Sequence, residues 1–146
     1  MLYDIIPSRN IDYSFYVKCD CGKELLHFTY YAETTNCEEI ISVKYYGPSS
    51  EKGANIFTFT LDSLRNLSDN LRLSLSEQTY TFVLHDGCIS LYVTKDNLGF
   101  YTIKRTHHKI SLMEDWEICI RDFTVETLII ELNNMHDKII DIRKQI

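Results

Sequence analysis

The stretch YTFVLHDGCISLYV, residues 80–93, decides the fold class because it reads as two strands joined by a tight turn. Apolar side chains occupy every second position in residues 80–84 and again in residues 89–93, which is the period of a half-buried strand. Between them, Asp86-Gly87 is a preferred centre for a two-residue type I′ turn. The stretch therefore predicts an antiparallel β-hairpin.

The same two-residue period recurs on both sides of this hairpin. It is present in residues 13–17, 26–30, 41–45, 57–59, 101–103 and 116–120. Polar or glycine-containing segments separate these runs, and the sequence shows neither an internal repeat nor a linker at a domain boundary. We expect one domain over residues 1–146, with seven to eight strands in an antiparallel sheet or a flattened β-sandwich.

One internal segment changes from the strand period to the helical period. Leu61, Leu64, Leu67 and Leu71 recur every three or four residues, which predicts one short internal helix from Leu61 to about Leu71. Thr60 precedes it and is a suitable N-cap, because its hydroxyl can accept a hydrogen bond from the first turn.

The C-terminal segment after Thr124, itself a candidate N-cap, is the most regular element and predicts a long helix. Its apolar positions have the 3,4 spacing of one helix face: Val125, Leu128, Leu132, Met135, Ile139 and Ile142. This stripe can pack on the chain's own sheet, or it can serve as the interface helix of a homodimer. We expect an α+β fold in which this helix packs on the sheet.

Composition and charge narrow the class of partner. The chain has 146 residues, 15 Lys plus Arg and 21 Asp plus Glu, for a formal net charge of −6. An acidic surface repels phosphates, so nucleic acid is a disfavoured partner and a basic protein is a favoured one. No apolar run reaches the ~20 residues of a membrane span, and no secretory signal is visible at the amino terminus. We expect a cytoplasmic protein without membrane contact.

The cysteines suggest one candidate metal site. There are five of them, and an odd number without a visible signal argues against a disulfide framework. Thiolate and imidazole groups suit tetrahedral zinc, and four candidate ligands are Cys19, Cys21, His85 and Cys88. The alternative is that Cys19 and Cys21 are ordinary thiols and that His85 and Cys88 merely flank a turn. We expect no cofactor, with zinc as the alternative.

The sequence contains one basic cluster and no catalytic signature. Lys104, Arg105 and Lys109 are candidate phosphate contacts, although a short charge run is more often a solvated loop. Phosphate-binding loops, dinucleotide-binding motifs, zinc-protease motifs and nucleophile elbows are all absent from the sequence. We therefore name no catalytic residue and expect a protein that is not an enzyme.

The order of elements resembles a known class of proteins. Phe57-Thr58-Phe59-Thr60 runs into the internal helix, two hairpins follow, and Arg121-Asp122-Phe123-Thr124 opens the terminal helix. This arrangement, over residues 13–146, and the acidity resemble small bacterial immunity-type proteins, which neutralise polymorphic toxins by binding them. The resemblance implies a non-enzymatic, intracellular protein-binding module with a basic target, and it carries no functional residues across.

Two further features bear on that expectation. Ten tyrosines suit a surface for protein recognition, although tyrosine is also a common strand residue that can simply cover a sheet. The alternative function is a small zinc-stabilised regulatory or phage-type protein with weak nucleic-acid contact.

Overall fold

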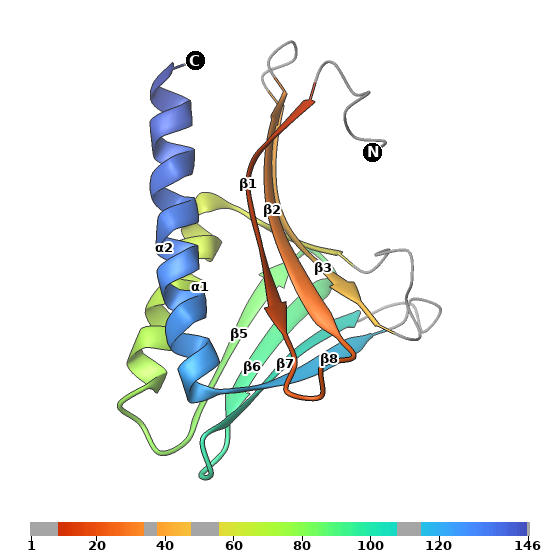
Figure 1. Cartoon of the computed structure of the whole chain (residues 1–146), viewed down its shortest axis with the longest axis vertical. Coiled ribbons are helices and arrows are strands. Elements are labelled where there is room, and N and C mark those ends of the chain that lie inside the picture. The colour runs from red at the N-terminus through yellow and green to blue at the C-terminus, as the bar shows by residue number, and fades with distance from the viewer. Residues whose placement is uncertain (1–8, 34–37, 48–55, 108–114, 146) are drawn as a thin grey trace.

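The computed structural model describes residues 9–33, 38–47, 56–107 and 115–145, and these have an α+β fold (Figure 1). The described strands form two antiparallel sheets of four strands each. The first sheet contains β1 (Arg9–Lys18), β2 (Leu25–Glu33), β3 (Glu38–Tyr46) and β4 (Ile56–Phe59). The second contains β5 (Tyr80–Asp86), β6 (Ile89–Lys95), β7 (Phe100–His107) and β8 (Trp116–Arg121). The helices are α1 (Leu61–Ser74) and α2 (Asp122–Gln145). The predicted fold class is confirmed.

Each half of the chain has the same topology. Four strands follow one another in an antiparallel meander, and a helix comes directly after the fourth strand. The sequence shows no corresponding repeat, because a meander needs only alternation and turns and can be encoded by unrelated residues.

The hairpin that decides the fold forms, but its two-residue turn is Gly87-Cys88 rather than the predicted Asp86-Gly87, because Asp86 is still paired as the last residue of β5. Leu84 pairs with Leu91 and Asp86 pairs with Ile89, so Gly87 lies in the turn between β5 and β6. Gly87 has a φ of 60°, a left-handed conformation that glycine adopts without a steric penalty. The register of β5 and β6 therefore follows from the chemistry of this turn.

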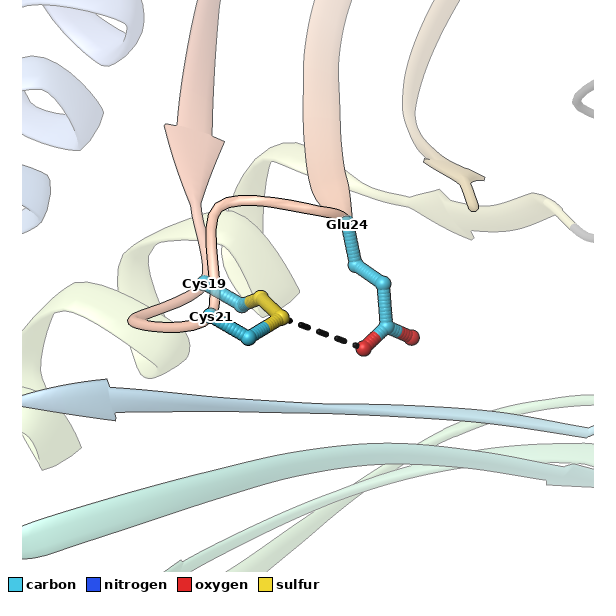
Figure 2. A group of neighbouring side chains, drawn as sticks. All are labelled: Cys19, Cys21 and Glu24. Carbon is cyan, nitrogen blue, oxygen red and sulfur yellow. Dashed lines mark hydrogen bonds between the residues drawn. A yellow bond between two sulfur atoms is a disulfide. The ribbon is translucent and has the colours of Figure 1, made fainter. Parts of the chain in front are cut away.

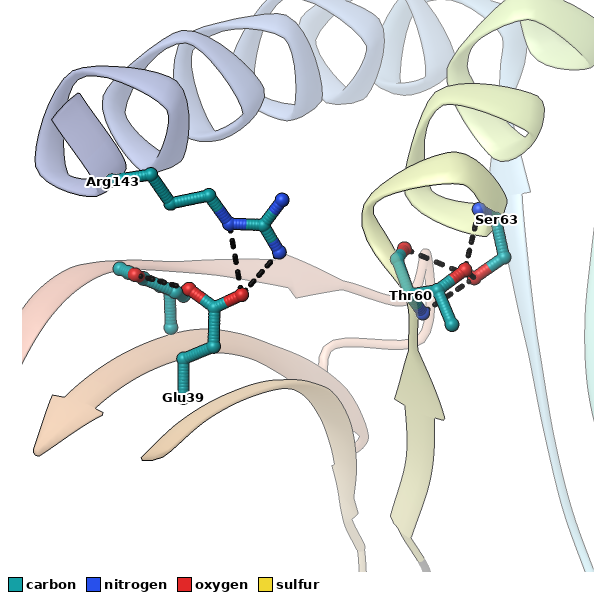
Figure 3. Close-up of polar contacts among 5 residues, drawn as sticks. Glu39, Thr60, Ser63 and Arg143 are labelled. Atoms are coloured by element: carbon teal, nitrogen blue, oxygen red, sulfur yellow. Dashed lines mark hydrogen bonds and ion pairs between the residues drawn. The ribbon is translucent and has the colours of Figure 1, made fainter. Parts of the chain in front are cut away.

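Thr60 caps α1 through two reciprocal hydrogen bonds, which Figure 3 shows. The Thr60 hydroxyl accepts from the backbone N–H of Ser63 at 3.0 Å, and the Ser63 hydroxyl accepts from the backbone N–H of Thr60 at 2.8 Å. This capping box satisfies two backbone donors at the helix start. The predicted cap is confirmed, and the helix ends at Ser74 rather than near Leu71.

Helix α2 begins earlier than predicted. It starts at Asp122, immediately after the last residue of β8, so Thr124 lies inside the first turn and the prediction that it is the N-cap is wrong. The Asp122 carboxylate accepts a hydrogen bond from the backbone N–H of Phe123 at 2.9 Å. An acidic side chain at this position also complements the positive end of the helix dipole.

The apolar stripe of α2 belongs to the chain's own core. Val125, Leu128, Leu132, Met135 and Ile139 are all buried, and Ile142 packs against the same core cluster. Helix α2 contacts α1, β1 and β8. The stripe is therefore covered within one chain, as the packing alternative predicts, and it does not form the exposed face that a homodimer through these residues requires.

Both helices lie on the same side of the first sheet, as Figure 1 shows. The C-terminal part of α2 is tied to β3 because Arg143 forms an ion pair with Glu39, also drawn in Figure 3. Glu39 in addition accepts a hydrogen bond from the hydroxyl of Tyr30 at 2.8 Å. The pKa of Glu39 is lowered, chiefly by the hydrogen bond from Arg143. No helix in the described part of the chain is long and apolar enough to cross a bilayer.

The two sheets meet through aromatic and polar contacts. The rings of Tyr45 on β3 and Trp116 on β8 stack with their centroids 5.5 Å apart. Arg105 on β7 is completely buried, and its Nε donates to the backbone carbonyl of Ile56 on β4 at 3.2 Å. These contacts hold one face of the first sheet against the second sheet, inside the molecule.

Candidate functional site

Cys19 and Cys21 form a disulfide in the loop between β1 and β2 (Figure 2). The expectation that they are ordinary thiols is therefore wrong. Strand β1 ends at Lys18 and both cysteines lie in the following turn, so their side chains are not held on opposite faces of a strand. Gly22, with a φ of 74°, completes that turn. The disulfide links two residues of one turn and is not a framework between distant segments.

The four candidate zinc ligands are not brought together. His85 and Cys88 lie at the β5–β6 hairpin, where His85 Nδ1 is 2.8 Å from the Ser90 hydroxyl and Cys88 is a free thiol. Among the described residues, the group able to hold a metal is Cys19 and Cys21 with Glu24 instead. The alternative that both residues flank the turn is also wrong in detail, because Cys88 is one of the two turn residues and His85 is paired with Ser90 inside the hairpin.

The basic cluster is divided between two faces of β7. Lys104 lines a hollow of about 540 Å³ on the outer face of the second sheet, beside Thr102, Thr106 and Glu117. Arg105 points the other way and is buried, and this burial lowers its pKa. The prediction that Arg105 contacts phosphate is therefore wrong. Lys109 lies outside the described residues.

The sequence left open whether the tyrosines form a surface for recognition or simply cover the sheet. In the structure some of them form a surface group, which we call the tyrosine face. It lies on the side of the first sheet that points away from the helices, and it consists of Tyr16, His27, Tyr31, Ile40 and Tyr46. Tyr16 is 61% exposed and Ile40 is 39% exposed, whereas the other three are partly exposed. A group of aromatic and branched apolar side chains that is partly exposed to solvent is typical of a binding surface.

The side chains of the tyrosine face contact one another. The rings of Tyr16 and His27 stack at 4.1 Å with an angle of 11° between their planes, and Tyr46 lies 6.3 Å from the same imidazole. The pKa of Tyr46 is raised, first by burial and then by the neighbouring hydroxyls of Tyr16 and Tyr31. Two tyrosines from the strands on either side of β2 thus lie against one histidine of that strand.

His27 is the neutral centre of this group. Its pKa is lowered, first by burial and then by the charge of Lys44. Its Nε2 atom is buried and has no hydrogen-bond partner among the residues that the structure describes. A buried polar atom without a partner is unusual in a folded protein, because its desolvation is not compensated.

Other tyrosines serve the core, so the two interpretations of the tyrosine content apply to different residues. Tyr30, Tyr45 and Tyr101 are at most 4% exposed and point toward the helices or the opposite sheet. Along β2, Tyr30 and Tyr31 are neighbours on opposite faces. The alternation of the strand therefore separates a packing tyrosine from a surface tyrosine.

In a comparison with known proteins, no family model and no curated protein matches this sequence.

Proposed function

We propose that this chain is a non-enzymatic protein-binding module that binds a basic protein partner through the tyrosine face. The observation that carries the proposal is a contiguous aromatic group in which the exposed ring of Tyr16 stacks on His27 and the partly exposed ring of Tyr46 lies tilted beside the same imidazole. Tyrosine supplies a large contact area with few rotatable bonds, and its hydroxyl hydrogen-bonds at the edge of an interface. A bacterial toxin-neutralising role, in the cytoplasm, is the form of this function that the order of elements favours.

The shape of the face suits a flat protein surface rather than a small molecule. It extends over three adjacent strands, with Tyr16 on β1, Tyr31 on β2 and Tyr46 on β3. At its centre, the hydroxyls of Thr29 and Ser42 are 3.1 Å apart and both side chains are buried. Small-molecule sites are concave, so a face spread over three strands suits a protein partner instead.

Charge supports a basic partner. The whole chain has a formal net charge of −6. Glu38 is exposed at one end of the first sheet, and alternation puts it on the same side as Ile40. A carboxylate at the margin of an aromatic surface complements lysine or arginine on a partner and increases the rate of encounter.

Affinity capture with matched variants tests this function. Wild-type chain, Tyr16→Ala and Tyr92→Ala are immobilised and exposed to an extract of the source cells, and retained proteins are identified by mass spectrometry. Tyr92 is a partly exposed tyrosine on the outer face of the second sheet, so its variant controls for loss of an aromatic residue. We expect one basic protein to be retained by the wild type and by Tyr92→Ala and to be lost with Tyr16→Ala.

Salt dependence provides the second readout. Association with a basic partner slows as ionic strength rises, because the Debye length shortens from about 30 Å at 0.01 M to about 8 Å at 0.15 M. The proposed function would be contradicted if all three immobilised proteins retained the partner equally. It would also be contradicted if the association rate did not change with salt concentration.

A further inference from the structure

The turn after β1 holds three metal-ligating side chains in one place. The ligand atoms of Cys19, Cys21 and Glu24 all lie within 4.8 Å of one another, and Figure 2 shows the glutamate carboxylate directed at the two sulfurs. Cys21 Sγ is 3.7 Å from Glu24 Oε1. In a tetrahedral zinc site with ordinary bond lengths, a sulfur and an oxygen ligand lie about 3.6 Å apart, so this pair already has the required spacing.

Backbone hydrogen bonds hold the turn in this shape. The Cys19 N–H donates to the Glu24 carbonyl at 2.9 Å, and the Gly22 N–H donates to the Cys19 carbonyl at 3.0 Å. The Lys23 N–H lies 3.5 Å from Cys21 Sγ and points to it as a donor. An N–H group directed at sulfur favours the thiolate form, which is the form that binds a metal.

The carboxylate of Glu24 is oriented by a buried residue. The hydroxyl of Tyr45 donates to Glu24 Oε2, which leaves Oε1 on the side of the sulfurs. Tyr45 is itself fixed by its stack on Trp116. A hydrogen bond that orients a metal ligand from behind is a regular feature of metal sites and strengthens metal binding.

We infer that reduction of the Cys19–Cys21 disulfide converts this turn into a three-ligand zinc site formed by Cys19, Cys21 and Glu24. A dithiol reduces the disulfide and becomes a disulfide itself, supplying two electrons and two protons, so that two thiols result. Zinc then binds both sulfurs and releases the two thiol protons to solvent. Cys21 is exposed and Glu24 is partly exposed, so the fourth zinc position is open to water.

The donor set selects a thiophilic cation. Two thiolates and one carboxylate suit zinc, whereas magnesium and calcium need a shell of oxygen ligands. The same sulfurs cannot bind zinc while they are bonded to each other, so occupancy depends on redox state. This inference does not rest on the proposed binding function, because the turn and the tyrosine face are different residues.

Metal titration of the full chain in both redox states tests the inference. Zinc is titrated against a chromophoric chelator, and cobalt is titrated with absorption spectroscopy, because bound thiolate gives cobalt a sulfur charge-transfer band. We expect one zinc per chain and a thiolate–cobalt band after reduction with a phosphine, and no binding by the disulfide form. Tyr45→Phe should weaken zinc binding by about 10- to 100-fold.

Variants identify the ligands. Cys21→Ser should abolish the cobalt band, Glu24→Gln should weaken binding without preventing disulfide formation, and Cys88→Ser should bind as the wild type does. Circular dichroism confirms that each variant is folded, and Glu24→Gln provides the test if Cys21→Ser is not. Zinc binding by the disulfide form, binding unchanged in both Cys21→Ser and Glu24→Gln, or binding lost in Cys88→Ser would overturn the inference.

Discussion

Replacing Leu132 by alanine probes whether the stripe of α2 is core or interface. Leu132 is 0% exposed, whereas Ile130, two residues earlier on the same helix, is 59% exposed. A buried leucine truncated to alanine loses both its transfer free energy and the packing around the cavity left behind, about 2–5 kcal/mol. Because a domain of this kind is stable by only about 5–15 kcal/mol, Leu132→Ala should remove a large fraction of the free energy of unfolding.

The assay is thermal and urea denaturation at two protein concentrations, with Ile130→Ala as the matched control. For a chain of this length, the loss from Leu132→Ala corresponds to a fall in Tm of roughly 4–20 °C. The free energy of unfolding of Ile130→Ala should stay within about 0.5 kcal/mol of the wild-type value, because the Ile130 side chain remains largely exposed to water in the folded protein. The wild-type Tm should be the same at both concentrations, since unfolding of a monomer involves no association.

Two results would refute this reasoning. If Leu132→Ala lowers the free energy of unfolding no more than Ile130→Ala does, the stripe does not contribute to the core. If the wild-type Tm rises with protein concentration and Leu132→Ala removes that rise, the stripe is a dimer interface after all.

Three other variants test local contacts. Thr60→Ala removes the side-chain half of the capping box and should lower the free energy of unfolding by about 1 kcal/mol in urea denaturation; no change would contradict the cap. Glu39→Gln should destabilise the chain at pH 7 and differ less from the wild type in acid. The lowered pKa of Glu39 gives stability that is present above the ordinary glutamate pKa and is lost as the pH falls through the folded value, so a difference independent of pH would contradict the Arg143 pairing. The pKa of His136 is lowered by burial and then by Arg65, so stability should fall as the pH drops below about 6.5, and His136→Gln should flatten that fall in pH-dependent thermal denaturation.

Most of the fold could be predicted because its signals are local. The two-residue period marks the strands, and Gly87 marks the turn of the central hairpin, although the turn begins at Gly87, one residue later than Asp86-Gly87 predicts. The end of α1 was less predictable because its final leucines fit a strand as well as a helix. In the structure Leu71 is buried and Leu73 is 59% exposed, as a helix requires.

The sites were harder to predict because they depend on contacts between distant residues. Both faces of β2 carry large side chains, so alternation separates Tyr30 from Tyr31 but does not tell which face the helices cover. The burial of Arg105 was hard to predict for the same reason, because it depends on where β4 lies. The third candidate ligand, Glu24, lies close to the two cysteines in the sequence, but a glutamate at this spacing is not a recognised zinc-binding pattern.

The affinity of the captured partner for three purified proteins tests the central claim most directly. The dissociation constant is measured by calorimetry for the wild type, Tyr16→Ala and Tyr92→Ala. If the tyrosine face is the binding surface, loss of an anchoring aromatic costs about 2 kcal/mol or more, so Tyr16→Ala should bind about 30-fold more weakly while Tyr92→Ala binds as the wild type does. An unchanged dissociation constant for Tyr16→Ala, together with a large loss for Tyr92→Ala, would place the binding surface on the second sheet and contradict the claim.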